Sequence, residues 1–278
     1  PVIVQYAKFL QGIFVDRKYP DDPALQAASP EIVTTCEAPC LGYSVMAHKS
    51  VTEIVKDTLP VSASIALAAF VLWMLAGVSG GILAALNRGK WLDRVIVGLA
   101  LIGFSLPTFF IGLLLLTFVA IKMKLVEIPR FVPLTEDPLA WAQSLTLPAI
   151  TLAMVFAASY VRLTRAYMLE TMSEDYIRTA RAKGVKESVV IRKHGLRAAL
   201  TPIVTAAGMD LGGLLGGAVI TEQVFGFRGL GYTAVRAIDT TDLPVIVGIV
   251  IVASTFVVIA NLVVDILYGV IDPRVRLT

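Results

Sequence analysis

The sequence predicts an all-α fold, a polytopic bundle of transmembrane helices, and three observations support this class. Hydrophobic residues make up 56% of the 278 residues, and charged residues only 16%, whereas soluble domains are about 45–50% apolar and about a quarter charged. Mean hydropathy is +0.78. The apolar residues also gather in uninterrupted blocks, and about 20 consecutive apolar residues cross a bilayer as a helix.

Five apolar blocks are long enough to span a membrane. They cover approximately Val61–Leu86, Val95–Ile121, Leu145–Val161, Leu200–Ile220 and Val245–Tyr268. Because the chain starts at Pro1 rather than at a methionine, we expect one further span to precede it in a longer product, which makes six.

Lysine and arginine in the connecting loops predict the orientation, because short basic loops face the cytoplasm. The short loop 87–94 carries three basic residues, and the loop 162–199 is strongly basic. Arg274 and Arg276 add positive charge to the C-terminal tail. This placement predicts a multi-pass cell-membrane protein with a cytoplasmic C-terminus, and it puts residues 1–60 outside the cytoplasm.

Two regions are predicted, an extracytoplasmic segment over residues 1–60 and a membrane domain over residues 61–278. The first region begins with apolar residues at helical spacing, typical of an amphipathic helix on a membrane surface. The polar, Pro-rich stretch 16–40 follows and is typical of a loop. Its Cys36 and Cys40 favour a disulfide, because neighbouring thiols outside the cytoplasm usually oxidise. Free cysteines, or a metal pair lacking its other ligands, are the alternatives.

Ionisable residues inside the predicted spans are few, and Asp210 is the most central of them. Two interpretations stay open for it, a residue that lines a pathway and a residue that joins helices. Gly213 and Gly217 follow it, and these three are the candidate pathway residues. No series of Asp, Glu and His residues crosses the membrane, which disfavours a proton-coupled transporter.

Two further patterns concern packing within the membrane. We expect Asp265, near the end of the last block, to pair with Arg162 or Arg165. Small residues repeat every four positions, which lets helices approach closely in lipid. The repeating glycines are Gly77 and Gly81, Gly208, Gly212 and Gly216, and Gly213 and Gly217.

The basic loop 162–199 contains a helix–glycine–helix pattern. Residues 173–183 form helices readily and carry acids in the first turn, where the helix dipole favours negative charge. Gly184 interrupts them, a second short helix follows, and Pro202 opens the next span. The pattern is typical either of a positive segment against anionic lipid or of a docking site for a cytosolic protein. Neither interpretation involves nucleic acid.

Catalytic motifs are absent from the sequence. It contains no G-x-x-x-x-G-K-[ST] phosphate loop, no H-E-x-x-H and no G-x-S-x-G. The chain is therefore expected not to be an enzyme, to bind no metal or cofactor, and to rely on another chain for any nucleotide hydrolysis. A membrane-embedded enzyme or scaffold is the competing class. The missing catalytic residues count against the enzyme, and the docking pattern counts against the scaffold.

At this loop the sequence resembles the permease subunits of ABC importers, whose signature is E-A-A-x-x-x-G followed by I-x-L-P. Gly184 and Ala180 match, and Leu200–Pro202 resembles the closing Leu-Pro with one residue inserted. Arg178 replaces the Glu, and the form "RTARAKG" is similar to the peptide and nickel branch. Residues 105–116, 216–248 and 261–274 agree with this branch, whereas residues 16–40 look like an insertion.

The resemblance implies a type I ABC importer permease fold and a first permease subunit that imports di- or oligopeptides; nickel, another metal chelate or heme is the alternative cargo. The implied partners are a homologous second permease, two cytosolic ATP-binding subunits that hold ATP and magnesium, an extracytoplasmic solute-binding protein and membrane lipid. The loop then couples the permease to the ATPases. The implied coupling residues are Arg178, Ala180, Lys183, Gly184, Val185, Lys186, Val189, Arg192, His194 and Pro202.

Overall fold

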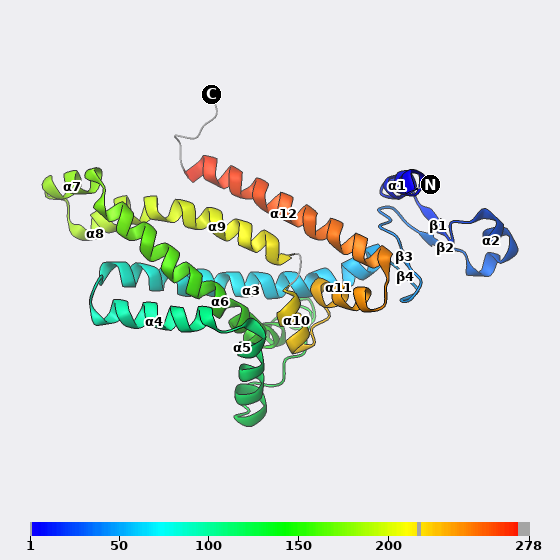
Figure 1. Ribbon diagram of the computed structural model, residues 1–278, viewed down its shortest axis with the longest axis horizontal. Helices are drawn as coiled ribbons and strands as arrows, with labels where there is room; N and C mark the ends of the chain where they lie inside the picture. Colours follow the sequence, from blue (N-terminus) through cyan, green and yellow to red (C-terminus); the bar gives the residue numbers. More distant parts are fainter. Residues whose placement is uncertain (1, 216–217, 272–278) are drawn as a thin grey trace.

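The computed structural model describes residues 2–215 and 218–271, and its long helices run lengthwise through the molecule (Figure 1). Three described helices, α3, α6 and α12, are long and apolar enough to cross a membrane, and two bent pairs bring the number to five if each is one span. The all-α prediction is confirmed. The long helices are α3 (Val51–Leu86), α4 (Trp91–Ser105), α6 (Pro138–Ser173), α9 (Arg197–Leu215) and α12 (Leu243–Ile271). The shorter ones between them are α5 (Thr108–Leu114), η2 (Leu115–Lys122), α7 (Asp175–Ala182), α8 (Glu187–Val189), η3 (Val190–Leu196), α10 (Val219–Phe225) and α11 (Leu230–Asp239).

The core of the bundle is the contact between α3 and α6. Trp73 of α3 is fully buried, and its ring stacks on Phe156 of α6 with 4.6 Å between the ring centroids. A Cβ atom at Gly77 would lie 2.5 Å from Cβ of Tyr160, and one at Gly81 would overlap the side chain of Thr164. The glycines therefore let the two backbones approach as the small-residue pattern predicts.

A second close contact joins α9 to α12. A Cβ atom at Gly208 would overlap the side chain of Val264, and one at Gly212 would lie 2.5 Å from Cβ of Ala260. A Cβ atom added at Gly213 would meet nothing within 4 Å, and the residue lies on the exposed side of α9. Gly216 and Gly217 lie outside the described residues.

Capping residues set the helix ends beyond the apolar blocks. The Ser50 side chain accepts a hydrogen bond from the Glu53 N–H at 3.2 Å, so α3 begins at Val51 rather than at Val61. The expected regional boundary after Pro60 consequently falls inside α3. Asp137 caps α6 in the same way by accepting from the N–H groups of Leu139 and Ala140.

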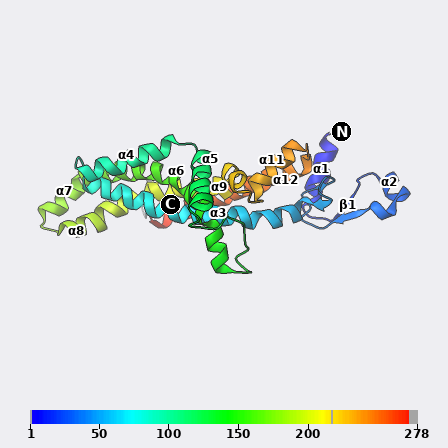
Figure 2. The ribbon, with the colours of Figure 1, turned by 90° about the horizontal axis from the view of Figure 1, so that it is seen from below.

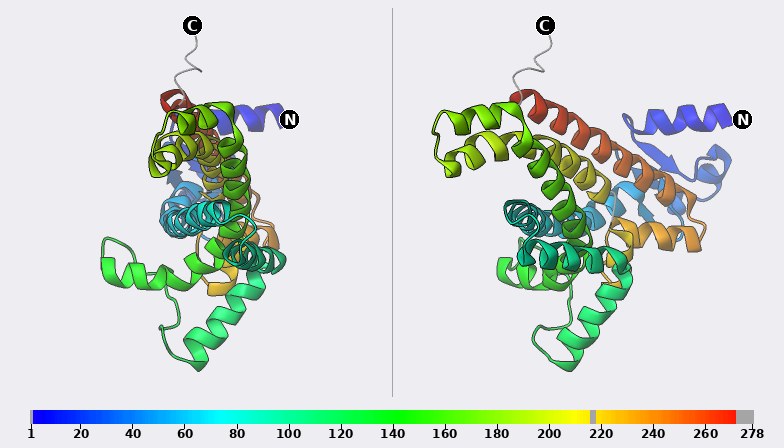
Figure 3. Two further views of the ribbon diagram at one scale, coloured as in Figure 1. Left: turned by 90° about the vertical axis from the view of Figure 1, so that its left-hand side faces the viewer. Right: turned by 60° about the vertical axis from the view of Figure 1, so that its left-hand side comes forward.

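The second apolar block does not form one straight span. The structure bends by 100° between α4 and the α5–η2 pair, and α5 leaves the side of the bundle (Figure 1; Figure 3 from other directions). Leu106 has an extended backbone with φ −91° and ψ 131°, because the residue before a proline disfavours the helical region. Pro107 then occupies the N-cap position of α5, which begins at Thr108. The predicted second span, Val95–Ile121, is therefore a bent pair of helices rather than one straight helix.

The first 50 residues form small folded units rather than a plain loop. After α1 (Val2–Gly12), β1 (Arg17–Tyr19) pairs antiparallel with β2 (Thr34–Cys36), and α2 (Pro23–Ala28) and η1 (Pro30–Ile32) lie between them. β3 (Tyr43–Ser44) pairs with β4 (Lys49–Ser50) directly before α3. These units lie at one end of the molecule (Figure 2).

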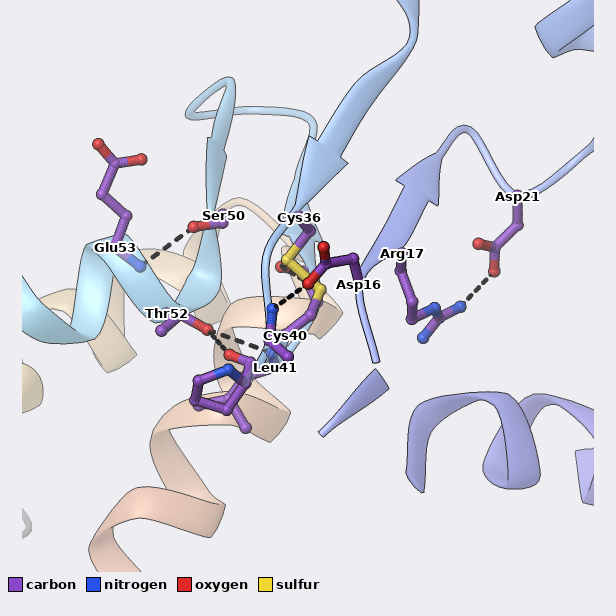
Figure 4. The surroundings of a disulfide bond; sticks show 12 residues. Asp16, Arg17, Asp21, Cys36, Cys40, Leu41, Ser50, Thr52 and Glu53 are labelled. Carbon is purple, nitrogen blue, oxygen red and sulfur yellow. Dashed lines mark hydrogen bonds and ion pairs between the residues drawn. A yellow bond between two sulfur atoms is a disulfide. The ribbon is translucent and has the colours of Figure 1, made fainter. Parts of the chain in front are cut away.

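Cys36 and Cys40 form a disulfide, the pairing that the sequence favoured. Figure 4 shows the bond between the two strand units, next to Asp16. The Asp16 carboxylate accepts a hydrogen bond from the Ala38 N–H at 2.8 Å, and the Cys40 N–H donates to the Gly12 carbonyl at 2.9 Å. The disulfide and these hydrogen bonds hold the polar segment against the end of α1.

Candidate functional site

The end of the molecule opposite the N-terminal strands is a helix–glycine–helix unit, residues 175–196 (Figure 1). It comprises α7, Gly184, α8 and η3; α6 leads into it and α9 leads out of it. The predicted pattern is therefore present, although Val190–Leu196 is a π-helix. Pro202 lies inside α9 instead of opening it, because η3 and α9 form a continuous helical run.

Gly184 is required at this turn by its backbone conformation. Its φ is +76°, a left-handed value that residues with a Cβ atom disfavour. A Cβ atom added there would meet nothing within 4 Å, so space does not limit the residue. The Gly184 N–H donates to the Arg181 carbonyl at 2.9 Å, and the Val185 N–H donates to the Ala180 carbonyl at 3.3 Å. These bonds close the end of α7.

The unit has an apolar inner side and a charged outer side. Ile177 and Val190 are fully buried and anchor it to the bundle, while Arg181 pairs with Glu187 across the turn at 2.7 Å. Of the predicted coupling residues, Arg178, Lys183, Gly184, Lys186, Val189 and Arg192 are exposed, and Ala180, Val185, His194 and Pro202 are half-buried. Val189 is thus exposed, whereas the next residue, Val190, is buried.

Asp210 has a partner on another helix. It lies on α9 and accepts a hydrogen bond from the Tyr160 hydroxyl of α6 at 2.7 Å. The contact gives Asp210 a packing role. A role in a pathway stays a prediction, as do the roles of Gly213 and of Gly217, which lies outside the described residues.

Asp93 forms an ion pair that the sequence did not predict. The Arg165 guanidinium donates two hydrogen bonds to the Asp93 carboxylate, at 2.7 and 2.8 Å, and the Gly89 N–H donates a third at 2.9 Å. The pair joins α4 to α6 near the helix–glycine–helix unit. Arg162 lies over the Phe104 ring instead, 4.2 Å from its centroid. The side chain of Asp265, for which both arginines were candidates, lies outside the described residues.

Glu222 is the second site that sequence reasoning missed. It lies on α10 with no exposed surface. Its carboxylate accepts a hydrogen bond from the Ser62 hydroxyl at 2.6 Å and one from the Tyr232 N–H at 2.7 Å. Ser62 in turn accepts from the Leu230 N–H at 2.8 Å. Two side chains from distant helices thus cap the N-terminus of α11, which otherwise has unpaired N–H groups. We call this arrangement the α11 cap.

Beside the α11 cap lies a cavity of about 1080 Å³, which we call the end cavity. Its walls come from the N-terminal half of α3, the segment between η2 and α6, the α10–α11 turn, α11 itself and the β3–β4 turn. Two of these elements, α11 and the β3–β4 turn, lie at the opposite end of the molecule from the helix–glycine–helix unit (Figure 1).

Comparison with known families identifies the kind of protein that has the helix–glycine–helix unit at one end and the end cavity at the other. Residues 77–277 match the family described as the binding-protein-dependent transport system inner membrane component. Residues 1–66 match the N-terminal family of the same transport system component. The chain belongs to this family of transporter subunits. The predicted family and the multi-pass membrane location are confirmed.

Named relatives and solved structures agree with the assignment. The chain is 40% identical over 236 residues to a putative peptide transport system permease protein of Brucella abortus (strain 2308), covering 85% of this chain and 75% of the relative. It is 37% identical over 259 residues to the dipeptide transport system permease protein DppB of Escherichia coli (strain K12), covering 85% of this chain and 76% of the relative.

Two solved transporters show the same fold. An inward-facing structure of the MetNI methionine ABC transporter superposes with a TM-score of 0.63 at 16% identity, over 80% of this chain and 97% of the other. The crystal structure of an amino acid ABC transporter with histidines superposes with a TM-score of 0.57 at 16% identity, over 81% and 95%. The predicted type I importer permease fold is confirmed.

Proposed function

We propose that this subunit carries di- or oligopeptides through the membrane into the cytoplasm, driven by ATP that partner subunits hydrolyse. The observation that carries the proposal is the exposed helix–Gly184–helix unit at one end of a chain whose relatives, 37–40% identical, are named for peptide transport. The chain acts as a conduit and has no catalytic site of its own; ATP and magnesium belong to its partners.

The helix–glycine–helix unit is suited to transmit movement. Ile177 and Val190 fasten it to the bundle by burial, and the Arg181–Glu187 pair spans its turn. Its exposed basic residues and the exposed Val189 offer a mixed surface to a cytosolic partner. In this proposal each of two ATP-binding subunits receives such a unit, one from this chain and one from a homologous second permease.

The opposite end faces a solute-binding protein in the same proposal, and the flanks of the bundle face lipid or the second permease. Large apolar side chains are exposed along these flanks, among them Leu99 on α4 and Val258 on α12. Exposed apolar surface of this kind marks membrane or protein contact. Each proposed partner therefore has its own surface: the ATP-binding subunit at one end, the solute-binding protein at the other, and lipid and the second permease on the flanks.

Single cysteines test the orientation, because the native pair is already joined in a disulfide. Val45 in the β3–β4 turn is 72% exposed, and the Arg178 side chain is 71% exposed at the other end. We expect a membrane-impermeant maleimide to label Val45→Cys in intact cells and Arg178→Cys only after permeabilisation, because basic loops face the cytoplasm. The reverse pattern contradicts the orientation and moves the coupling surface to the wrong side.

Uptake by the complete reconstituted importer tests the cargo. We expect proteoliposomes that contain both permeases and both ATPases to accumulate radiolabelled tripeptide when loaded binding protein and ATP are on the proper sides. Nickel ions, a nickel chelate and heme are the comparison substrates. Accumulation of one of these without peptide uptake shows that the peptide assignment is wrong, whereas the family assignment stands.

A further inference from the structure

The end cavity carries an excess of positive charge. Three arginines from separate elements line it: Arg130 before α6, Arg228 in the α10–α11 turn, and Arg236 on α11. All three are exposed, and none has an ion pair or a side-chain hydrogen bond to another described residue. Three separate segments of the described chain thus each contribute one unpaired guanidinium group to the lining of the end cavity.

The two acidic residues that line the cavity only partly balance the three arginines. Asp57 lies 3.4 Å from the Lys49 ammonium, and Asp242 accepts a hydrogen bond from the Ser44 hydroxyl. Like charges in one hollow repel each other and concentrate anions from solution. The lining thus keeps an excess of positive charge, which favours an anion that does not belong to the described chain.

The cavity keeps its shape without that anion. Phe227 in the α10–α11 turn is almost fully buried, and its ring meets Phe131 edge-on with 5.9 Å between the centroids. The α11 cap holds the same turn through Ser62 and Glu222. The arginines thus line a cavity whose floor at Phe227 and Phe131 is already packed, which lowers the entropic cost of binding a ligand.

Guanidinium groups favour carboxylates, because their planar donors match the two oxygens. The volume of about 1080 Å³ lies just above the range of small-ligand sites, about 300–1000 Å³, so an extended peptide of a few residues fits. A peptide always has a carboxylate at its C-terminus, whatever its side chains. An apolar floor with arginines around it suits such a ligand.

We propose that the end cavity is a transit site for the cargo peptide, where Arg130, Arg228 and Arg236 bind its terminal carboxylate. The proposal rests on the proposed peptide cargo. It makes the permease a participant in peptide selection, because a peptide without a free carboxylate would leave the binding protein but enter the membrane domain poorly.

The test compares uptake of trialanine and of trialanine amide by the complete reconstituted importer. Both peptides are supplied at concentrations that saturate the binding protein, whose affinity for each is measured separately. We expect wild-type importer to transport trialanine faster than the amide. Arg228→Gln with Arg236→Gln should slow trialanine uptake about tenfold, the effect of losing a charge-assisted hydrogen bond, and leave amide uptake unchanged.

Lys56→Gln is the matched control. Lys56 is exposed on α3 next to Asp57 and does not line the cavity, so both rates should stay at the wild-type value. Equal slowing of both peptides by the arginine variants overturns the proposal and assigns the arginines to acidic side chains of the binding protein. Unchanged trialanine uptake also overturns it. Failure of wild-type importer to take up either peptide, while it accumulates nickel or heme, instead overturns the peptide cargo.

Discussion

Replacing Gly184 with proline is expected to abolish coupled uptake while the chain still inserts into the membrane. Gly184 has a φ of +76°, whereas the proline ring holds φ near about −65° and removes the N–H. That N–H now donates to the Arg181 carbonyl. The turn must therefore rearrange, and the surface offered to an ATPase changes shape. Uptake should fall by at least about tenfold, which corresponds to about 1.4 kcal/mol in the barrier to transport.

Two alanine variants separate the coupling role from backbone strain. Gly89 in the α3–α4 loop has a φ of +78° and, like Gly184, no neighbour within 4 Å of an added Cβ. Alanine costs about 1–2 kcal/mol at either position, yet only Gly184→Ala should lower the ratio of peptide transported to ATP hydrolysed. Wild-type uptake and ATPase stimulation in Gly184→Pro would refute the coupling assignment.

Charge reversal tests the same surface with the turn intact. Lys186 and Arg192 are both exposed, so Lys186→Glu with Arg192→Glu leaves the packing of the unit in place. We expect the double variant to co-purify with less ATPase than the wild type, and additional salt to weaken the wild-type contact, because exposed charge pairs are screened.

Replacing Glu222 with alanine is expected to produce a large loss of stability. The change leaves the Ser62 hydroxyl and the Tyr232 N–H without their present acceptor inside the protein. Each buried donor left unpaired costs about 1–3 kcal/mol, so the free energy of unfolding should fall by about 4 kcal/mol. A lower unfolding temperature in detergent and faster hydrogen exchange at the first amides of α11 are the measurements.

Glu222→Gln is a milder change at the same position, and Glu127→Ala is a control at an exposed glutamate. Glutamine keeps one acceptor oxygen but points an amide donor at other donors, so it should destabilise the protein less than alanine. Glu127 is exposed between η2 and α6, and its removal should leave the unfolding temperature unchanged. Protection of the α11 amides at the wild-type level in Glu222→Ala would show that the cap does not hold this helix.

Local patterns predicted the features that depend on neighbouring residues. The apolar blocks, the glycines of α3 and the turn at Gly184 all follow from short stretches, because helix formation and close packing depend on adjacent positions. The disulfide follows as readily, since Cys36 and Cys40 are four residues apart. The family resemblance rested on stretches of the same kind.

Pairings between distant residues were beyond sequence reasoning. Ser62 and Glu222 are 160 residues apart, and Asp93 and Arg165 are 72 apart. Hydropathy shows that such residues need partners but does not say which partners the fold supplies. The bend at Pro107 was missed for another reason. Hydropathy averages over a long apolar block, whereas the bend depends on one residue, Leu106, which the following proline keeps out of the helical region.

The length of α3 has a mechanical consequence. Its 36 residues form a rod of about 54 Å at about 1.5 Å per residue, well beyond a hydrocarbon core of about 30 Å. One end lines the cavity through Asp57 and Thr58, and the other packs on α6 near Gly81. A tilt of about 10° about the midpoint moves each end by about 5 Å in opposite directions. If α3 moves as one rigid body, it acts as a lever, and a small displacement at one membrane surface changes the width of the end cavity at the other.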